Sequence, residues 1–419
     1  MNPERPSPQP WTRGDQLSSI LLGVGLALTT ATKLRVPGVP LGPAEAVLLL
    51  WLLDAVFRTV WGGAVWVGGV ARAVLTTWTV LLGALFLGFG VAVLAGRADV
   101  RDTRDFFAFG LAAVLVGVFV VRPWLRRRVW VTTQALVMAL LVMCVLLFAV
   151  GVLGARGLVF YGGVRFAGLA ENPNQLALVL APVPFLSLWF RRRATGRRRV
   201  LFTAALVAAG VFGVATASDA LALAWLASGS GLLAWATMRW AARGWTSRRV
   251  VAQLGVLVAG SGAVAALLVV LPPVVRAGER YARAVEGEGN QASVREVLWA
   301  HGLQAIARSP LVGWGPGAHS GLAEPFTNAE AHNTFIDAGM NGGAVAVGAY
   351  LGYLAWAGYG LARRREAVGL AGLVAVALFA CFHYVLRQPA FWFMTLGLAV
   401  LGRGAVGHAE ALRRPVARP

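Results

Sequence analysis

The sequence predicts an all-α protein that crosses a membrane many times, and composition and spacing both indicate this class. Of its 419 residues, 58% are hydrophobic and only 13% are charged. The mean hydropathy is +0.68. The apolar residues gather in blocks of about 20, which is the helix length that a bilayer requires. A polytopic membrane protein is therefore expected, with no soluble domain.

Twelve such blocks follow one another, and each is expected to form a membrane-spanning helix. They lie near residues 16–32, 41–60, 74–96, 105–121, 129–153, 174–190, 200–217, 220–240, 250–272, 334–362, 367–386 and 389–402. The first block follows a polar leader and is trailed by eleven more, so it is predicted to be a span rather than a cleaved signal. Residues 1–419 are expected to form one integral membrane domain.

The basic residues predict how the chain is oriented. A net charge of +20 in a soluble protein would suggest nucleic acid, but here the arginines stand in short runs between spans, and no nucleic-acid partner is expected. With the N-terminus in the cytoplasm, the cytoplasmic connections hold 19 basic residues and the short outer ones hold eight. The positive-inside rule therefore predicts that both termini are cytoplasmic.

One connection, residues 273–333 between the ninth and tenth spans, is far longer than the others and is predicted to be extracytoplasmic. Long ordered loops usually carry function. Its stretch "ASVREVLWAHGLQAIARSP" predicts a helix that ends at Ser309-Pro310. The glycines that follow, at 313, 315 and 317, favour a tight turn over a nest of N–H groups for an anion.

Two spans begin at this outer face with capping signals. In "RFAGLAENPNQLALVL", Asn172 is expected to cap a helix whose first residue is Pro173, and Arg165 stands a few residues upstream. The N–H groups of the helix N-terminus at Asn172 and Asn174, with a guanidinium nearby, suit the oxygens of a phosphate.

The other span begins in "AHNTFIDAGMNGG". Thr334 and Asp337 have the spacing of a capping box, so Thr334 is expected to cap the helix and Asp337 to occupy its third position. The cap does not explain His332, which precedes it. Two interpretations stay open: a histidine satisfied at an interface, or a functional one that faces the long loop.

A metal centre or cofactor is not expected. Cys144 and Cys381 both lie inside apolar blocks, and two isolated thiols form neither a zinc site nor a disulfide framework.

Three stretches together carry a family resemblance. The order "VRFAGLAENPNQLA", "SVREVLWAHGLQAIARSPLVGWGPG" and "AHNTFIDAGMNGG" resembles the O-antigen ligase and polymerase family over about residues 156–402. The N-terminal third is similar in hydropathy only. Members of that family are metal-independent membrane glycosyltransferases that take a glycan from a polyprenyl (undecaprenyl) diphosphate carrier on the outer leaflet of the cytoplasmic membrane.

The resemblance implies roles for particular residues. Arg165 and Arg295 would hold the diphosphate, and His332 would lie beside the anomeric carbon, as base or as stabiliser of the leaving group. Asn333 and Asp337 would support it. The implied partners are a polyprenyl-diphosphate-linked glycan and a glycan or lipid acceptor, lipid A-core-like or other, at a site that faces the periplasm or the cell exterior.

The chain also departs from the family pattern. Ser218-Asp219 stands where the family usually has a Ser-Arg pair, so Asp219 is open between a ligand for a sugar hydroxyl and a solvated turn residue. Met340 stands near a position where a glutamate is frequent, and Asp337 is the candidate substitute. Arg387, at the outer end of the eleventh span, is open between the carrier site and an arginine that snorkels to the interface.

The resemblance does not separate a ligase from a repeat-unit polymerase. A transporter of a small anion or of a glycan lipid is an alternative class, but it would place ionisable groups near the bilayer midplane, and here nearly all charges lie at span ends. A non-catalytic scaffold is a third class. Retention of both arginines and His332 favours the enzyme. The oligomeric state is not predicted.

Overall fold

The computed structural model describes residues 10–35, 42–62, 65–98, 100–241, 291–320 and 329–402. Most of these residues are helical, and the strands among them form one two-stranded hairpin, β1 (Phe160–Tyr161) and β2 (Arg165–Phe166). The helices are α1 (Arg13–Leu28), η1 (Thr32–Leu34), α2 (Pro43–Gly62), α3 (Gly69–Leu94), α4 (Val100–Val120), α5 (Leu125–Val152), α6 (Arg156–Val159), α7 (Pro173–Leu180), α8 (Val183–Arg193), α9 (Gly196–Ala215), α10 (Asp219–Ala241), α12 (Gln291–Arg308), α13 (Thr334–Arg363), α14 (Ala367–Ala380) and α15 (Pro389–Leu401). Seven stretches of the described chain are helical, long and apolar enough to cross a membrane. The fold is therefore that of an all-α polytopic membrane protein.

Eleven of the twelve predicted blocks form helices, and the ninth, near 250–272, lies outside the described residues. The sixth is two helices rather than one, because Pro182 separates α7 from α8. Trp225 Nε1 donates to the Ala181 carbonyl at this break, at 2.8 Å. The eleventh block is shorter than expected, since α14 has 14 residues and would span only about 21 Å of a hydrocarbon core about 30 Å thick. The number of spans therefore stays a prediction.

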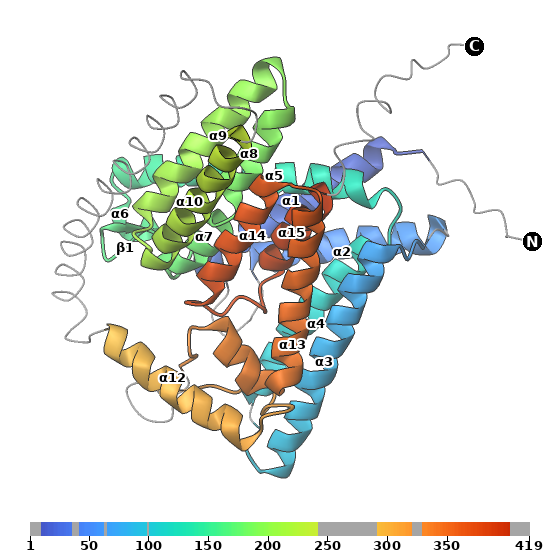
Figure 1. The fold of residues 1–419 in the computed structure, drawn as a ribbon, viewed down its shortest axis with the longest axis vertical. Helices are drawn as coiled ribbons and strands as arrows, with labels where there is room; N and C mark the ends of the chain where they lie inside the picture. The colour runs from blue at the N-terminus through green and yellow to red at the C-terminus, as the bar shows by residue number, and fades with distance from the viewer. Residues whose placement is uncertain are drawn as a thin grey trace, which may run out of the picture.

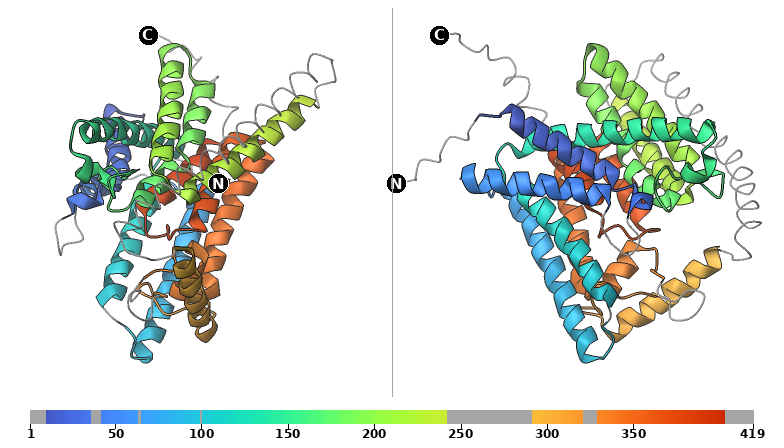
Figure 2. Two further views of the ribbon diagram at one scale, coloured as in Figure 1. Left: turned by 90° about the vertical axis from the view of Figure 1, so that its left-hand side faces the viewer. Right: turned by 180° about the vertical axis from the view of Figure 1, so that it is seen from behind.

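The helices pack in neighbouring groups around α15 (Figure 1). Helices α1, α2 and α5 form one group, α3, α4 and α13 a second, and α8, α9, α10 and α14 a third, and α15 contacts members of all three. Figure 2 shows α12 standing apart from these groups, beside the outer half of α13. Helix α15 is buried from 390 to 401, and its Trp392 ring lies 4.4 Å from the ring of Trp78. A helix apolar on every side is expected at such a central position.

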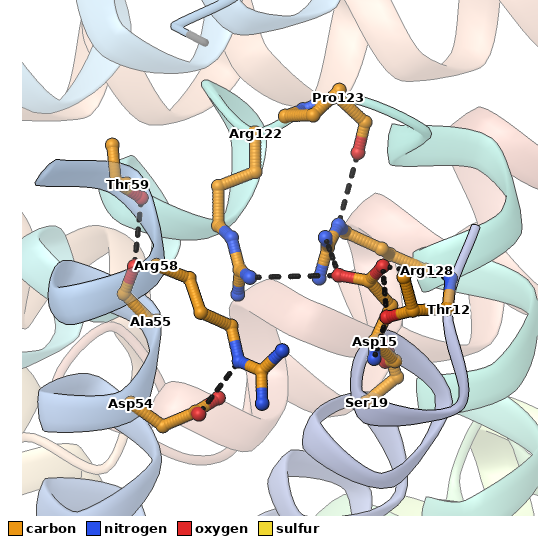
Figure 3. Close-up of polar contacts among 10 residues, drawn as sticks. All are labelled: Thr12, Asp15, Ser19, Asp54, Ala55, Arg58, Thr59, Arg122, Pro123 and Arg128. Carbon is orange, nitrogen blue, oxygen red and sulfur yellow. Dashed lines mark hydrogen bonds and ion pairs between the residues drawn. The ribbon is translucent and has the colours of Figure 1, made fainter. Parts of the chain in front are cut away.

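Five charged residues join the helix ends on one side of the molecule (Figure 3). Arg128 at the start of α5 donates to Asp15 at the start of α1, at 2.6 Å, and Arg122 lies 3.9 Å from the same carboxylate. Arg58 pairs with Asp54 at 2.7 Å near the end of α2, so the two neutralise each other as their spacing suggests. We call Asp15, Asp54, Arg58, Arg122 and Arg128 the inner cluster.

The helix ends on the opposite side of the molecule also contact one another. This is expected when successive helices cross a membrane in alternating directions. Thr32, after α1, donates to Gln175 of α7 at 2.8 Å. Arg387, just before α15, is paired with Asp105 near the start of α4 and with Glu330, which precedes α13. We call this set, which comprises the end of α1 and the starts of α4, α7, α13 and α15, the outer helix ends. Which face is cytoplasmic is still a prediction from the positive-inside rule.

Helix α13 is broken inside its length at Gly342 and Gly343. Gly343 has φ +62, and a Cβ there would lie 2.2 Å from the backbone carbon of Leu311. Only glycine fits such a position, where the backbone is left-handed and a second chain approaches closely. The break thus makes room for the loop that follows α12.

That loop, residues 309–317, fills the break with backbone hydrogen bonds. Trp314 N donates to Met340 O at 2.7 Å and Gly315 N to Asn341 O at 2.9 Å. In return, Ala344 N donates to Pro310 O at 2.8 Å. Gly317 N donates to Asp102 Oδ1 at 2.9 Å. The predicted tight turn is confirmed, and the alternative of an anion-binding nest is wrong, because the helix and Asp102 already use these N–H groups.

Candidate active site

The start of α13 differs from the predicted capping box. Asn333, not Thr334, is the N-cap, and its Oδ1 accepts from Phe335 N at 3.0 Å. Asparagine ranks above threonine at this position. The Thr334 hydroxyl is engaged elsewhere, because it donates to His383 O at 2.6 Å and accepts from Val385 N at 3.2 Å. Asp337 consequently stands at the fourth helical position and not the third.

His332 has a left-handed backbone, with φ 53. Such a conformation costs about 1–3 kcal/mol in a residue with a side chain and persists only where its surroundings hold it. Asp337, which is 1% exposed, stabilises this conformation. Its two carboxylate oxygens accept from Ala331 N at 2.8 Å and Asn333 N at 3.0 Å, the residues on either side of His332. Asp337 therefore fixes the turn that carries the histidine.

The Thr334 hydroxyl also brings a second histidine to this place. His383 lies in the connection between α14 and α15, and its ring centroid is 6.2 Å from that of His332, at 68° between the ring planes. Phe379 stacks on the His383 ring at 4.7 Å. His383 was not among the predicted site residues, although its position one turn before Arg387 at a helix end was a usable signal.

Arg165 comes to the outer helix ends on the β1–β2 hairpin. Its Nε donates to Thr216 O at 3.1 Å, and its Nη2 donates to Asn174 Oδ1 at 3.3 Å. The predicted start of α7 is confirmed: Pro173 is the first helical residue, and Asn172 caps the helix by accepting from Asn174 N at 2.8 Å. The guanidinium therefore lies at the N-terminus of α7, beside the end of α9.

Arg295 lies on α12, which ends at Arg308 as the sequence predicts. Trp299 Nε1 donates to Ala331 O at 2.9 Å, and Gly302 faces the Ile336 side chain, so α12 packs against the His332 turn. The Arg295 side chain is half-buried. Among the described residues it has no hydrogen-bonded or ion-paired partner.

The pKa shifts of the two histidines reflect burial and the positive charges nearby. Burial lowers the pKa of His383 to about 3, with further contributions from His332, Arg295 and Arg165. Desolvation, then Arg295, lowers the pKa of His332. The His332 residue itself is exposed to solvent. No carboxylate of the described chain contributes to either shift. We call Arg165, Arg295, His332 and His383 the cationic site.

Two other predicted site residues, Arg387 and Asp219, differ in their pairing and exposure. Arg387 does not snorkel: it is paired with Asp105 and Glu330, and it lies over the Tyr384 ring at 5.0 Å. Its charge is therefore balanced within the protein. Asp219 is exposed at the first residue of α10, where the positive end of the helix dipole favours a carboxylate. Within the described ranges, no group of three or more His, Cys, Asp or Glu residues is arranged to hold a metal ion.

Asn341 and Tyr384 link the outer half of α13 to the segment that carries His383. The neighbours of the Asn341 amide determine its orientation. Its oxygen accepts from the Tyr384 hydroxyl at 2.6 Å, and its nitrogen donates to Ala318 O at 3.0 Å and Gly315 O at 3.3 Å. Sequence reasoning missed this buried link, which holds the His383 segment at a second point besides Thr334.

Fold and site together define a polytopic membrane protein with a cationic, two-histidine site at its outer helix ends. Residues 221–351 match the family model described as O-antigen ligase. The matched segment includes Arg295 and His332, whereas Arg165 and His383 lie outside it. No curated protein matches the chain.

Proposed function

We propose that this protein is a metal-independent glycosyltransferase that moves a glycan from a polyprenyl diphosphate carrier to an acceptor at the outer face of the cytoplasmic membrane. The observation that carries the proposal is that Arg295 acts on His332 and that Arg165 and Arg295 both act on the neighbouring His383. The family match supports the class of reaction. A ligase that uses a lipid acceptor, lipid A-core-like or other, is the leading form.

The chemistry follows from the charges. The donor's diphosphate is a leaving group that departs with the electron pair of its bond to the anomeric carbon. Two guanidinium groups stabilise that developing charge, and the N-terminus of α7 adds its dipole. Neutral His332 accepts the proton of the acceptor hydroxyl as its oxygen bonds to the anomeric carbon, a role that a lowered pKa suits near pH 7.

The break in α13 bears on the alternative of a transporter. Carriers use broken helices to present backbone groups and ionisable residues to a substrate near the midplane. Here the loop 309–317 occupies the break, and its backbone bonds the groups that the break frees. Arg295, which has no hydrogen-bonded or ion-paired partner in the described part of the chain, lies instead beside the helix ends, which favours a surface enzyme.

The test is transfer from a purified polyprenyl-diphosphate glycan by detergent-solubilised protein in EDTA, with acceptor lipid present or absent. We expect transfer by the wild type and a loss of about 10²–10⁴-fold in His332→Ala, the usual contribution of a general base. His319→Ala, in the same loop, is the matched control and should retain activity. Normal transfer by His332→Ala would rule the mechanism out.

Transfer with and without the acceptor lipid distinguishes a ligase from a repeat-unit polymerase. A ligase requires the added acceptor lipid, whereas a repeat-unit polymerase lengthens the carrier-linked glycan without it. Carrier binding without turnover in any arm would favour a transporter or a scaffold.

A further inference from the structure

The second histidine has no role in the reaction as written above. It lies at the outer helix ends next to His332, and neither ring has a hydrogen-bond partner among the described residues. A half-buried imidazole whose nitrogens the fold does not use is available to a ligand. Resting on the proposed function, we propose that His383 is a second catalytic residue, which binds the acceptor hydroxyl together with His332.

The spacing of the rings supports a shared ligand. With centroids 6.2 Å apart and planes at 68°, the two rings are too far apart to hydrogen-bond each other. The space between them suits one oxygen atom with hydrogen bonds of about 2.8 Å to both rings. A hydroxyl oxygen that is both donor and acceptor matches two neutral imidazoles, each of which offers one N–H and one free nitrogen.

The position of His383 is fixed by contacts that do not use its nitrogens. Thr334 holds the His383 carbonyl at 2.6 Å and the Val385 N–H at 3.2 Å, and Phe379 stacks on the ring. The same threonine is the first residue of α13, two residues after His332. One hydroxyl group therefore sets the distance between the two histidines and leaves both rings free to contact substrate.

The two imidazoles have different tasks because their proton affinities differ. The groups that face His383 are His332, Arg295 and Arg165, all of which disfavour its protonation, and burial adds to them. His383 is thus the poorer proton acceptor and keeps its hydrogen bond without changing its protonation state. As the acceptor oxygen bonds to the anomeric carbon and the bond to the diphosphate breaks, the hydroxyl proton passes to His332 alone.

The experiment compares His383→Phe with Phe379→Leu. The first variant keeps an aromatic ring to stack on Phe379 but removes both nitrogens; the second removes the stack and keeps both imidazoles. We expect His383→Phe to lower kcat/KM for the acceptor about tenfold, the worth of one hydrogen bond to the reacting group. The dissociation constant of the carrier lipid should stay within twofold. Phe379→Leu should change kcat/KM for the acceptor by less than threefold.

The outcomes separate this inference from the proposed function. Absence of transfer in the wild type overturns both. Wild-type transfer with an unchanged kcat/KM in His383→Phe overturns the role of His383 and leaves the function of His332 intact. A fall in Tm together with equal losses for carrier and acceptor would mark His383 as structural and would also overturn the inference.

Discussion

The arginines at the two ends of the helices differ in what balances their charge. In the inner cluster, Arg128 and Arg122 share Asp15, and Arg58 is paired with Asp54. In the cationic site, Arg295 acts on both histidines and Arg165 on His383, and no carboxylate of the described chain contributes to the pKa shifts of those histidines. Both groups join segments that are far apart in the sequence.

The difference separates arginines that hold the fold from Arg295, which has no hydrogen-bonded or ion-paired partner among the described residues and is available to an anion. A buried guanidinium paired with a carboxylate is structural, because removal of either partner leaves an uncompensated charge. A guanidinium without a counter-charge raises the local potential and attracts a ligand such as diphosphate. Arg387 lies at the outer helix ends but resembles the inner cluster, since Asp105 and Glu330 balance it.

The largest expected effect is on stability, in the inner cluster. Arg128→Gln leaves Asp15 without its closest partner, and Arg128 is only 3% exposed, so we expect a loss of about 3–5 kcal/mol. Arg127→Gln, one residue earlier and exposed, is the matched control. Unfolding in mixed detergent micelles measures both. Equal stability of the two variants would show that the inner cluster does not hold these helix ends together.

Next in size is the effect of Arg295→Gln, on transfer rather than stability. Removing one positive group that faces the developing charge should lower kcat/KM for the carrier about 10²–10³-fold. Because Arg295 has no partner among the described residues, Tm should not fall. Arg308→Gln, exposed on the same helix, should behave as wild type. A fall in Tm with unchanged transfer would place Arg295 with the structural arginines.

A smaller effect is expected where the fold supports the site. Asp337→Asn keeps the size of the side chain but replaces one of the two oxygens that accept from Ala331 N and Asn333 N. Loss of one such bond allows the His332 turn to relax, and we expect about a tenfold fall in kcat. Asp219→Asn, at an exposed helix start, is the control. Wild-type kcat in Asp337→Asn would show that the turn does not need this clamp.

The smallest effect is a displacement of the pH profile. Arg295 lowers the pKa of His332, which keeps the imidazole neutral, and active as a base, to lower pH. In Arg295→Gln the pKa of His332 rises toward 6.5, so activity is lost at a higher pH as the solution is acidified. Arg295→Lys keeps the charge and should keep the wild-type acid limb. Coincident acid limbs in all three proteins, measured from pH 5 to 8, would contradict the assigned coupling.

Much of the fold followed from local signals. Hydropathy located the long apolar helices of the described chain, and the Asn172-Pro173 start of α7 and the end of α12 at Arg308 were predicted because caps and prolines act over a few residues. The cap at Asn333 was missed because Thr334 has a tertiary partner, His383 O, in a segment 49 residues away. The spacing of a capping box cannot report such a contact.

The sequence predicted candidate residues for the site but could not predict how their charges are balanced. Arg165, Arg295 and His332 stay predictions as site residues, and in the structure all three lie within electrostatic reach of His383. Arg387 has the same residue type at a similar helix end, yet Asp105 and Glu330 neutralise it. Carboxylates from two distant segments decide that outcome, and only the tertiary structure brings them to the arginine.

The interlocked backbones of α13 and loop 309–317 also bear on how this protein can change over generations. Their hydrogen bonds form two pairs, one that joins residues 310 and 311 to 344 and 345 and one that joins 314 and 315 to 340 and 341, and glycine is required at Gly343 by the approach of Leu311. A deletion between residues 311 and 314 would put the two pairs out of step. The helix and the loop therefore have to be exchanged together. A chimera between relatives must place its junctions outside residues 309–345.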